Sequence, residues 1–339
     1  MKHFLRIALS LGLSGVFVAV AVRDVSWPEA WAALRSAHLG YVAPVILFGG
    51  VSLYFRALRW GVLLAPIADV PSRSLFSATS IGFTANMLLP LRAGEILKPW
   101  FLARKERLPL APLLATVALE RLFDMATLLF FFAAATLTMP LPPEWKRYGW
   151  IFLATFVVFL SLVVALQRSP ERFLAGLVVV LRPFPQTVSD RVIGAARQFA
   201  AGLASLRRPS AVGLAVAHSL GVWVMLAASF GFGLSALDLA VPWVRGALAL
   251  TTFVAIAVSI PGGPGFIGMF QVGCIVALEV YGVSRSAAFS YSVFVHVLQF
   301  ATTVGLGLFF FLRENLSLNE IREIRAEAES DSARRSLGD

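Results

Sequence analysis

Charge, cysteine and histidine are all scarce in this sequence. Only 14% of its 339 residues are charged, whereas 58% are hydrophobic, and the mean hydropathy is +0.79. A soluble domain has about 25% charged residues. The single cysteine, Cys274, excludes an internal disulfide and a cysteine metal cluster. The four histidines do not have the spacing of metal ligands, so we expect neither a metal nor another cofactor: His3, His38, His218 and His296.

Long apolar runs take the place of charge. Runs of about 20 residues, long enough to cross a bilayer, recur along nearly the whole chain. They predict an all-α, polytopic membrane protein, because the strands of a membrane barrel would be shorter and alternating. The first run could be a signal peptide, but it is long for one, so we interpret it as an uncleaved span. We expect six full spans: 4–22, 41–64, 110–139, 149–167, 210–236 and 287–312.

Two further apolar pieces, 74–91 and 246–281, are interrupted by Pro and Gly. We expect each to be a re-entrant hairpin that returns to the side from which it entered; eight full spans is the alternative. With a cytoplasmic N-terminus, this scheme places most of the 29 Lys and Arg residues in the cytoplasm, and Arg56 and Arg59 are counted there. That bias is the one the positive-inside rule requires. Both termini are then cytoplasmic.

The remaining segments lie on the cytoplasmic side in this scheme. Residues 168–208 are rich in arginine, and an apolar stripe at about 187–206 predicts an amphipathic helix on the inner leaflet. We divide the chain into a transmembrane domain, 1–312, and a cytoplasmic tail, 313–339. The net charge of +10 is attributed to the positive-inside bias and to anionic lipid rather than to nucleic acid.

The order of the pieces predicts an inverted repeat. A span, a hairpin and a span within residues 41–139 are followed by the same three pieces within 210–312, in the opposite orientation. The likeness in sequence is slight, a Gly four residues after Pro90 and after Pro261. Inverted repeats with broken helices that meet near the bilayer midplane are a common plan of transporters.

The first candidate site is the stretch NMLLPLRAGEILKPW, residues 86–100, in which charges stand beside helix breakers. Irregular backbone persists at membrane depth only where it is buried in protein or lines a wet cavity. Freed backbone N–H groups, an arginine fork and a lysine together suit a phosphate. The alternative is a charged cytoplasmic turn. The predicted anion-site residues here are Asn86, Arg92, Glu95 and Lys98.

The second candidate site is a trio within the predicted span 110–139: Glu120, Arg121 and Asp124. At 100° per residue they occupy one sector of the helix, about 100° wide. Each charge near the bilayer centre costs about 3 kcal/mol, so such residues face a cavity or each other. The alternative is a self-satisfied ion pair that fixes helix packing. One negative charge is left over, and we expect Arg92 or Lys98 to neutralise it.

The third candidate site is VSIPGGPGFIGMFQ, residues 258–271. Its two prolines and four glycines exclude a continuous helix, so its backbone amides are expected to line a site. The alternative is a tight extracellular loop. His296 and Gln299, on a later span, are interpreted as interhelical hydrogen-bonding residues. The predicted site residues are Gly262, Gly263, Gly265 and Gln271.

These three motifs, in this order, resemble the transmembrane domain of lysylphosphatidylglycerol synthases over about residues 5–312. The resemblance implies a flippase-like protein of a bacterial inner membrane that moves an anionic phospholipid or a polyprenyl-phosphate-linked lipid between leaflets. It also implies no catalysis by this chain, since the soluble aminoacyl-transferring half of the synthases is not expected here. Relatives often carry Glu at the position of Gln271, which sets this chain apart.

Two other functions stay open at this stage. One is a non-catalytic scaffold for a partner that modifies lipids or transfers sugars. The other is an intramembrane enzyme acting on a lipid phosphate, because Ser284, Arg285 and Ser286 are similar to the Ser-Arg-Ser loop of undecaprenyl-diphosphate phosphatases, although Ala287 stands where that loop has glycine. The sequence has no Gly-x-x-x-x-Gly-Lys loop, so we do not expect this chain to hydrolyse ATP.

Overall fold

The computed structural model describes residues 2–89, 92–138, 209–260 and 263–314, together with parts of 146–194, and within these residues it is helical with no strand. Three of the helices are long and apolar enough to cross a membrane, those at Leu39–Leu64, Ser210–Ala236 and Arg285–Arg313. The helices are α1 (Lys2–Val22), α2 (Trp27–Arg35), η1 (Leu39–Tyr41), α3 (Val42–Leu64), α4 (Ser72–Leu88), α5 (Gly94–Glu106), α6 (Leu110–Thr138), α8 (Pro170–Leu181), α10 (Pro209–Ala236), α11 (Trp243–Ser259), η4 (Pro264–Phe266), α12 (Met269–Glu279) and α13 (Arg285–Arg313).

Five of the six predicted spans coincide with helices to within two residues at either end, namely α1, α3, α6, α10 and α13. The sixth, 149–167, is described only in part, and α8 falls in the segment predicted to be cytoplasmic. The predicted amphipathic helix at 187–206 and the tail at 313–339 lie mostly outside the described residues. The all-helical prediction is therefore confirmed, whereas the number of spans stays a prediction.

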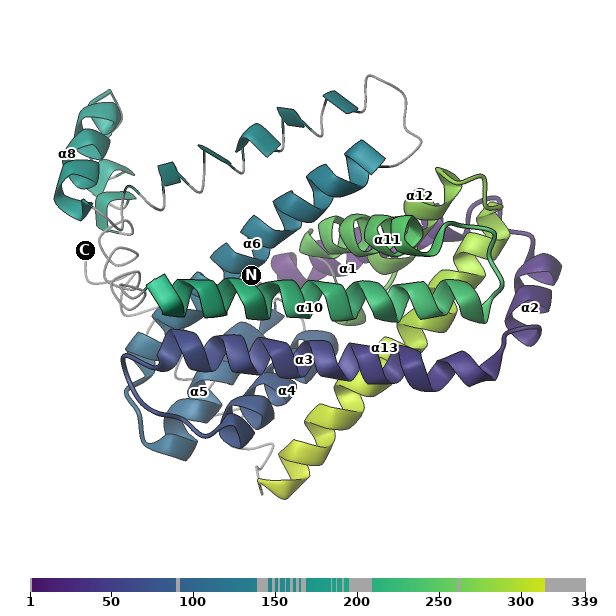
Figure 1. Ribbon diagram of the computed structural model, residues 1–339, viewed down its shortest axis with the longest axis horizontal. Helices are drawn as coiled ribbons and strands as arrows, with labels where there is room; N and C mark the ends of the chain where they lie inside the picture. Colours follow the sequence, from purple (N-terminus) through teal and green to yellow (C-terminus); the bar gives the residue numbers. More distant parts are fainter. Residues whose placement is uncertain are drawn as a thin grey trace.

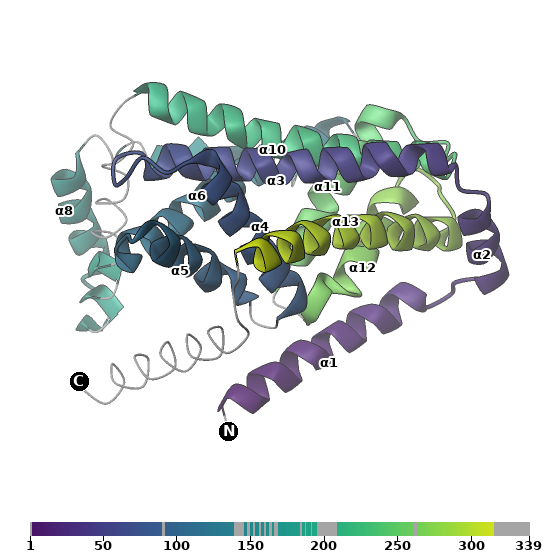
Figure 2. The same ribbon diagram turned by 90° about the horizontal axis from the view of Figure 1, so that it is seen from below.

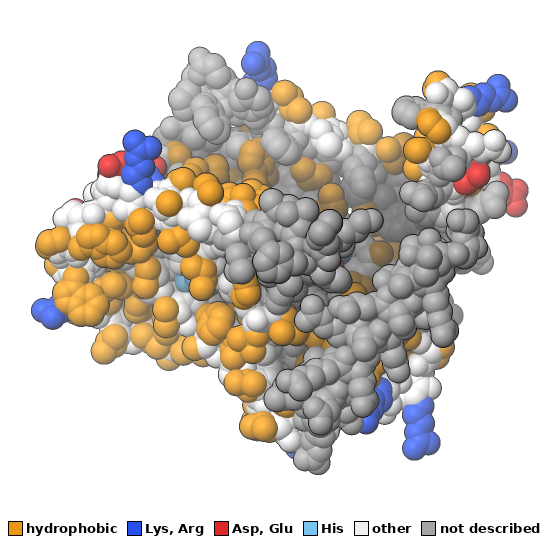
Figure 3. All heavy atoms as spheres, turned by 180° about the vertical axis from the view of Figure 1, so that it is seen from behind, with side chains coloured by type: hydrophobic (Ala, Val, Ile, Leu, Met, Phe, Trp, Pro, Cys, Tyr) orange, Lys and Arg blue, Asp and Glu red, His pale blue; other side chains and the backbone are white. Residues whose placement is uncertain are grey.

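Helices α3 and α10 lie side by side and antiparallel along one face of the bundle (Figures 1 and 2). Small side chains let them approach: a Cβ on Gly221 would lie 2.6 Å from the ring of Phe55. The hydroxyl of Ser229 on α10 donates to the carbonyl of Val45 on α3 at 2.9 Å. On the opposite face of the molecule, hydrophobic side chains cover broad areas of the surface, with Lys and Arg mostly at the margins (Figure 3). Such a surface suits a lipid environment.

Each of the two Pro/Gly-interrupted pieces forms a pair of packed helices. Helices α4 and α5 are separated by residues 89–93, the first break, and α11 and α12 by residues 260–268, the second break. Pro90 and Pro261 lie outside the described residues. The residues that end α4 and α11, Leu89 and Ile260, are extended, as residues before proline prefer.

The internal repeat predicted from the order of the pieces is visible in helix lengths. Helices α4 and α11 have 17 residues each, and α6 and α13 have 29 each. Both 17-residue helices begin directly after a proline, Pro71 or Pro242. Packing follows the same rule, since α4 lies against α13 as α11 lies against α6. The two repeats, α3–α6 and α10–α13, therefore interlock through their broken helices.

A pair of hydrogen bonds aligns the repeats residue by residue. In the first repeat the indole of Trp60 on α3 donates to the hydroxyl of Thr116 on α6 at 2.9 Å. In the second, the hydroxyl of Tyr291 on α13 donates to the carbonyl of Phe230 on α10 at 2.7 Å. Thr116 and Tyr291 are each the seventh residue of their 29-residue helix. Equivalent positions can therefore be compared along the two repeats.

Helix α1 belongs to neither repeat and runs along one edge of the bundle (Figure 2). It packs against α12. The close contact is at Gly268, where a Cβ would lie 2.7 Å from the backbone nitrogen of Val18. Helix α1 therefore covers the second break from the side.

Candidate functional site

Asp124 of α6 is surrounded by arginines from α3. Its carboxylate accepts from Arg59 at 2.8 Å and from Arg56 at 3.4 Å. Arg59 is only 1% exposed and also donates to the hydroxyl of Ser219 on α10 at 3.1 Å. Arg56 and Arg59, counted above with the cytoplasmic charges, both lie within α3 and face α6. This contact joins three helices through buried charge.

Glu120, one turn earlier on α6, pairs with Lys98 of α5. The ammonium nitrogen lies 2.6 Å from a carboxylate oxygen, and both side chains are buried. The same ammonium stands 4.0 Å from the centre of the Trp60 ring, a cation–π contact. The unmatched carboxylate of the trio was expected to meet Arg92 or Lys98, and Lys98 is the partner.

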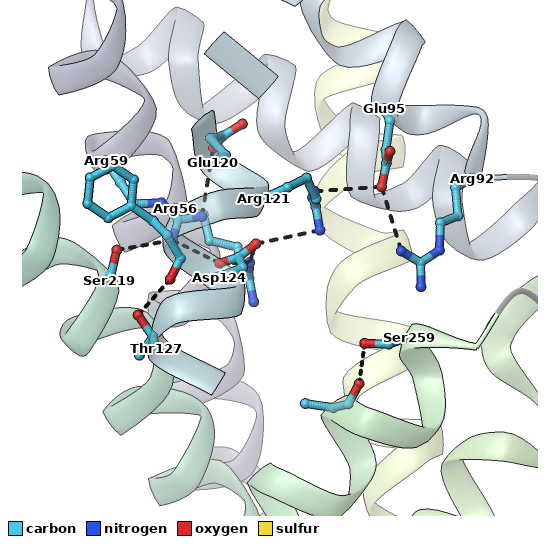
Figure 4. Close-up of polar contacts among 12 residues, drawn as sticks. Arg56, Arg59, Arg92, Glu95, Glu120, Arg121, Asp124, Thr127, Ser219 and Ser259 are labelled. Carbon is cyan, nitrogen blue, oxygen red and sulfur yellow. Dashed lines mark hydrogen bonds and ion pairs between the residues drawn. The ribbon is translucent and has the colours of Figure 1, made fainter. Parts of the chain in front are cut away.

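Arg121 links this buried charge to a more open edge. Its guanidinium lies 3.5 Å from Asp124 on one side and 3.6 Å from Glu95 on the other. Glu95 in turn lies 3.8 Å from Arg92. Figure 4 shows these side chains in one row from the first break to α3. About a third of each of these three side chains is exposed, 38% for Arg121, 32% for Glu95 and 33% for Arg92.

We call these eight residues the charge cluster: Arg56, Arg59, Arg92, Glu95, Lys98, Glu120, Arg121 and Asp124. Five are cations and three are carboxylates, so the cluster carries surplus positive charge within a bundle of apolar helices. Buried charge of one sign is costly unless a counter-ion neutralises it. The open edge at Arg92 and Arg121 is where an anion from outside the protein can supply that neutralisation.

Asn86 lies beside the same edge, next to the helix break. Its side-chain oxygen is buried and has no hydrogen-bond partner within the part of the chain that the structure describes. A Cβ on Gly94 would lie 2.7 Å from that oxygen and 1.8 Å from the carbonyl oxygen of Gly82. Only glycine at position 94 lets α4 and α5 come this close. The four residues predicted at the first break are thus all in or beside the charge cluster.

The two breaks touch through Arg92. Its guanidinium donates to the carbonyl of Val258 at the end of α11, at 2.7 Å. Arg92 itself has a left-handed backbone, φ 54°, which an arginine adopts only when its surroundings hold it there. Helix η4 of the second break also packs on α4. The irregular backbone of both repeats therefore meets inside the bundle.

The second break has no charged side chain, and two of its backbone N–H groups already donate hydrogen bonds within the protein. The N–H of Gly263 donates to the hydroxyl of Ser14 on α1, and the N–H of Gly268 donates to the side-chain oxygen of Gln271, each at 2.7 Å. Gln271 also contacts His296 of α13. The predicted residues Gly263, Gly265 and Gln271 lie together here, apart from the charge cluster, while Gly262 lies outside the described residues.

Ser284, Arg285 and Ser286 are engaged in holding helix ends. The hydroxyl of Ser284 caps α13, and Arg285 donates to the carbonyl of Val20 at the end of α1. The backbone of Ser26 donates to Ser286. Among the described residues, no group of three or more His, Cys, Asp or Glu could hold a metal ion.

Sequence reasoning missed Arg56, Arg59 and Ser219. A signal was present, since two arginines three residues apart in an apolar run share one helix face. What the sequence could not supply is the register of α3 against α6, which brings that face to Asp124.

Comparison with known proteins identifies the family of this chain. Residues 7–307 match the family described as the lysylphosphatidylglycerol synthase TM region. No match was found among curated proteins. The family and the apolar helices together make this a multi-pass membrane protein.

Proposed function

Because this chain belongs to the family of the lysylphosphatidylglycerol synthase TM region, we propose that it moves an anionic phospholipid or a polyprenyl-phosphate-linked lipid between leaflets. The observation that carries the proposal is the charge cluster, whose surplus cations end in an open edge at Arg92 and Arg121. A headgroup phosphate is the counter-ion that a membrane supplies, and guanidinium groups bind its oxygens in pairs.

Glu95 is the group that a lipid phosphate would replace at the guanidiniums of Arg92 and Arg121. Its carboxylate lies between Arg92 and Arg121, 3.8 and 3.6 Å away, too far for full hydrogen bonds. A phosphate entering from the edge competes with Glu95 for both guanidiniums and makes shorter contacts. The buried pairs behind it, such as Lys98 with Glu120, hold the helices in place and do not need to move.

The two breaks act as alternating gates in this proposal. In this scheme the protein lies in a bacterial inner membrane, with both termini on the cytoplasmic side. The helix pairs α4–α5 and α11–α12 are re-entrant hairpins that enter from opposite faces of that membrane. The bond from Arg92 to the Val258 carbonyl closes the path between them. A phosphate that binds Arg92 would take the guanidinium from that carbonyl and so couple loading to opening.

The chain itself performs no catalysis in this proposal and uses no cofactor. The driving force is a gradient, a partner protein or the concentration difference of the lipid. An enzyme that modifies lipids is the expected kind of partner, because it would supply or consume the transported lipid.

The test is lipid transport by the purified protein in vesicles. Fluorescent phosphatidylglycerol, with phosphatidylcholine as the comparison, is placed in one leaflet and its appearance in the other is followed by chemical quenching. Arg92→Ala and Arg121→Ala should each lower transport at least about tenfold, the equivalent of one lost charge-assisted bond. Glu95→Ala should also lower transport, because no carboxylate then displaces the headgroup from the two guanidiniums. Arg73→Ala is the control, because Arg73 is exposed at the start of α4.

Three results would overturn the proposal. Transport unchanged in all three variants would make the open edge an ordinary charged surface. A wild-type protein that moves no lipid but binds a lipid-modifying partner would be a scaffold. A change in lipid mass detected by mass spectrometry would identify an enzyme.

A further inference from the structure

The second break holds a histidine whose orientation is fixed by its neighbours. The side-chain oxygen of Gln271 accepts from the N–H of Gly268 at 2.7 Å. Its amide nitrogen therefore points the other way and lies 2.9 Å from Nδ1 of His296. An amide nitrogen is a donor only, so Nδ1 accepts, and the proton of the neutral imidazole is on Nε2.

Among the described residues, no atom accepts a hydrogen bond from that Nε2–H. His296 is 7% exposed, and its Nε2 is buried without a hydrogen bond. The ring is stacked on Phe270, 4.3 Å between centroids, so it cannot turn away easily. It faces the backbone of Gly265 without completing a bond to it. A buried, oriented donor without an acceptor is costly, which points to an acceptor that arrives from elsewhere.

His296 occupies the position in the second repeat that Arg121 occupies in the first. His296 is the twelfth residue of α13, and Arg121 is the twelfth residue of α6. Arg121 contacts Glu95 of α5, near the start of the helix after the first break, and His296 contacts Gln271 near the start of the helix after the second. The two side chains are thus equivalent groups, one charged and one neutral, at the two breaks.

We propose that Nε2–H of His296 is a second binding point for the anionic oxygen of a lipid phosphate, reached after the headgroup leaves Arg121 and Arg92. This inference rests on the proposed function and adds the group that receives the headgroup in the second repeat. Gln271 is a positioning residue in this scheme, since it holds the tautomer that donates.

The surroundings of His296 favour a neutral donor. On α12, α13 and α4 the charged residues lie at helix ends: Glu279, Arg285 and Arg313 on α12 and α13, and Arg73 at the start of α4. Helices α2 and α3 also pack against α13 and carry Glu29, Arg35, Arg56 and Arg59. The other groups there that can lose a proton, Cys274 and Tyr291, are buried. A neutral donor binds a phosphate less tightly than two guanidiniums do, so a headgroup passed to His296 is held and still released.

The test uses substitutions that separate the two ring nitrogens. His296→Asn keeps an acceptor for Gln271 at the place of Nδ1 but removes the outer donor. His296→Gln keeps a donor at the place of Nε2 but loses the inner acceptor. If His296 binds the headgroup, Asn lowers vesicle transport of phosphatidylglycerol about fivefold to tenfold, the range for one hydrogen bond, and Gln lowers it less. The reverse order would show a purely structural role and overturn the inference. His38→Gln, at an exposed position, is the control.

A second measurement identifies the ligand directly. In protein carrying nitrogen-15 histidine, the Nε2 signal missing from the His296→Gln spectrum should shift with phosphatidylglycerol nanodiscs and not with phosphatidylcholine. A shift with inorganic phosphate alone would assign the site to free phosphate, and no shift with either would overturn the proposal. If Arg121→Ala lowers transport while all His296 variants match the wild type, this inference fails and the proposed function stands. If neither residue matters, both fail.

Discussion

The two repeats have the same order of helices and equivalent contacts between those helices, yet their side chains differ in charge. At equivalent positions the first repeat pairs Arg59 with Asp124 at 2.8 Å, whereas the second pairs Ser229 with Gln299 at 3.4 Å. Asp124 and Gln299 are each the fifteenth residue of a 29-residue helix. The scaffold therefore does not require charge at these positions. The ionised residues of the first repeat need another explanation, and ligand binding supplies one.

The largest effect should come from removing the carboxylate that three arginines share. Asp124→Asn leaves Arg56, Arg59 and Arg121 without a common counter-ion, and we expect a loss of about 3–5 kcal/mol of stability. The equivalent change in the second repeat, Gln299→Leu, removes one long hydrogen bond and should cost about 1 kcal/mol or less. Thermal unfolding in detergent measures both. Similar losses in the two variants would contradict the contrast between the repeats.

The buried pair of Lys98 and Glu120 gives the next effect. Lys98→Met or Glu120→Gln alone leaves one charge without its 2.6 Å partner and should cost about 2–3 kcal/mol. The double variant removes both charges, so we expect it to be more stable than either single variant. Additive losses in this double-mutant cycle would mean that the pair does not act as a unit.

A smaller effect should follow from separating α4 and α5. Gly94→Ala puts a methyl group against the Gly82 carbonyl, so the helices must move apart, at about 1–2 kcal/mol. Because the same movement shifts Asn86 and the charge cluster, transport should fall with stability. Gly305→Ala in α13 is the matched control, since nothing lies within 4 Å of a Cβ there. Equal behaviour of the two variants would show that the close approach is not needed.

The smallest loss of stability is expected at a contact that is polar in one place and apolar at the equivalent place of the other repeat. The hydroxyl of Thr84 on α4 donates to the carbonyl of Thr303 on α13 at 2.8 Å. Ala255 and Leu128 occupy the equivalent places and pack in an apolar cluster. Thr84→Val should thus cost about 1 kcal/mol or less, measured by the same unfolding experiment. A loss as large as that of Asp124→Asn would refute the equivalence of these positions.

Much of the fold could be predicted from the sequence because apolar runs and prolines act locally. The ends of α3, α6 and α10 follow the apolar runs closely, and both breaks fall at the predicted prolines. The family predicted from the three motifs is confirmed. The candidate site was predicted less completely, since Arg59 pairs with a residue on a different helix. That pairing depends on how far two helices slide along each other, which no local pattern records.

The repeat itself was only half recognised from the sequence. Proline spacing carries it, because Pro71 precedes Pro90 by the same interval as Pro242 precedes Pro261. The likeness predicted from the sequence rested on the glycines after Pro90 and Pro261 and did not include the prolines that precede the two 17-residue helices. Side-chain identity differs between the repeats, whereas the lengths of α4 and α11 and of α6 and α13 are the same.

The interlocking of α4 with α13 and of α11 with α6 sets a condition on biosynthesis. When the ribosome has completed the first repeat, the face of α4 that includes Thr84 lacks its contact with α13, because α13 belongs to the second repeat and is made later. The first repeat must therefore wait in the membrane with polar groups uncovered. An insertion chaperone that shields α4 until α13 arrives would meet that need, and truncation before α13 should leave a chain that quality-control proteases degrade.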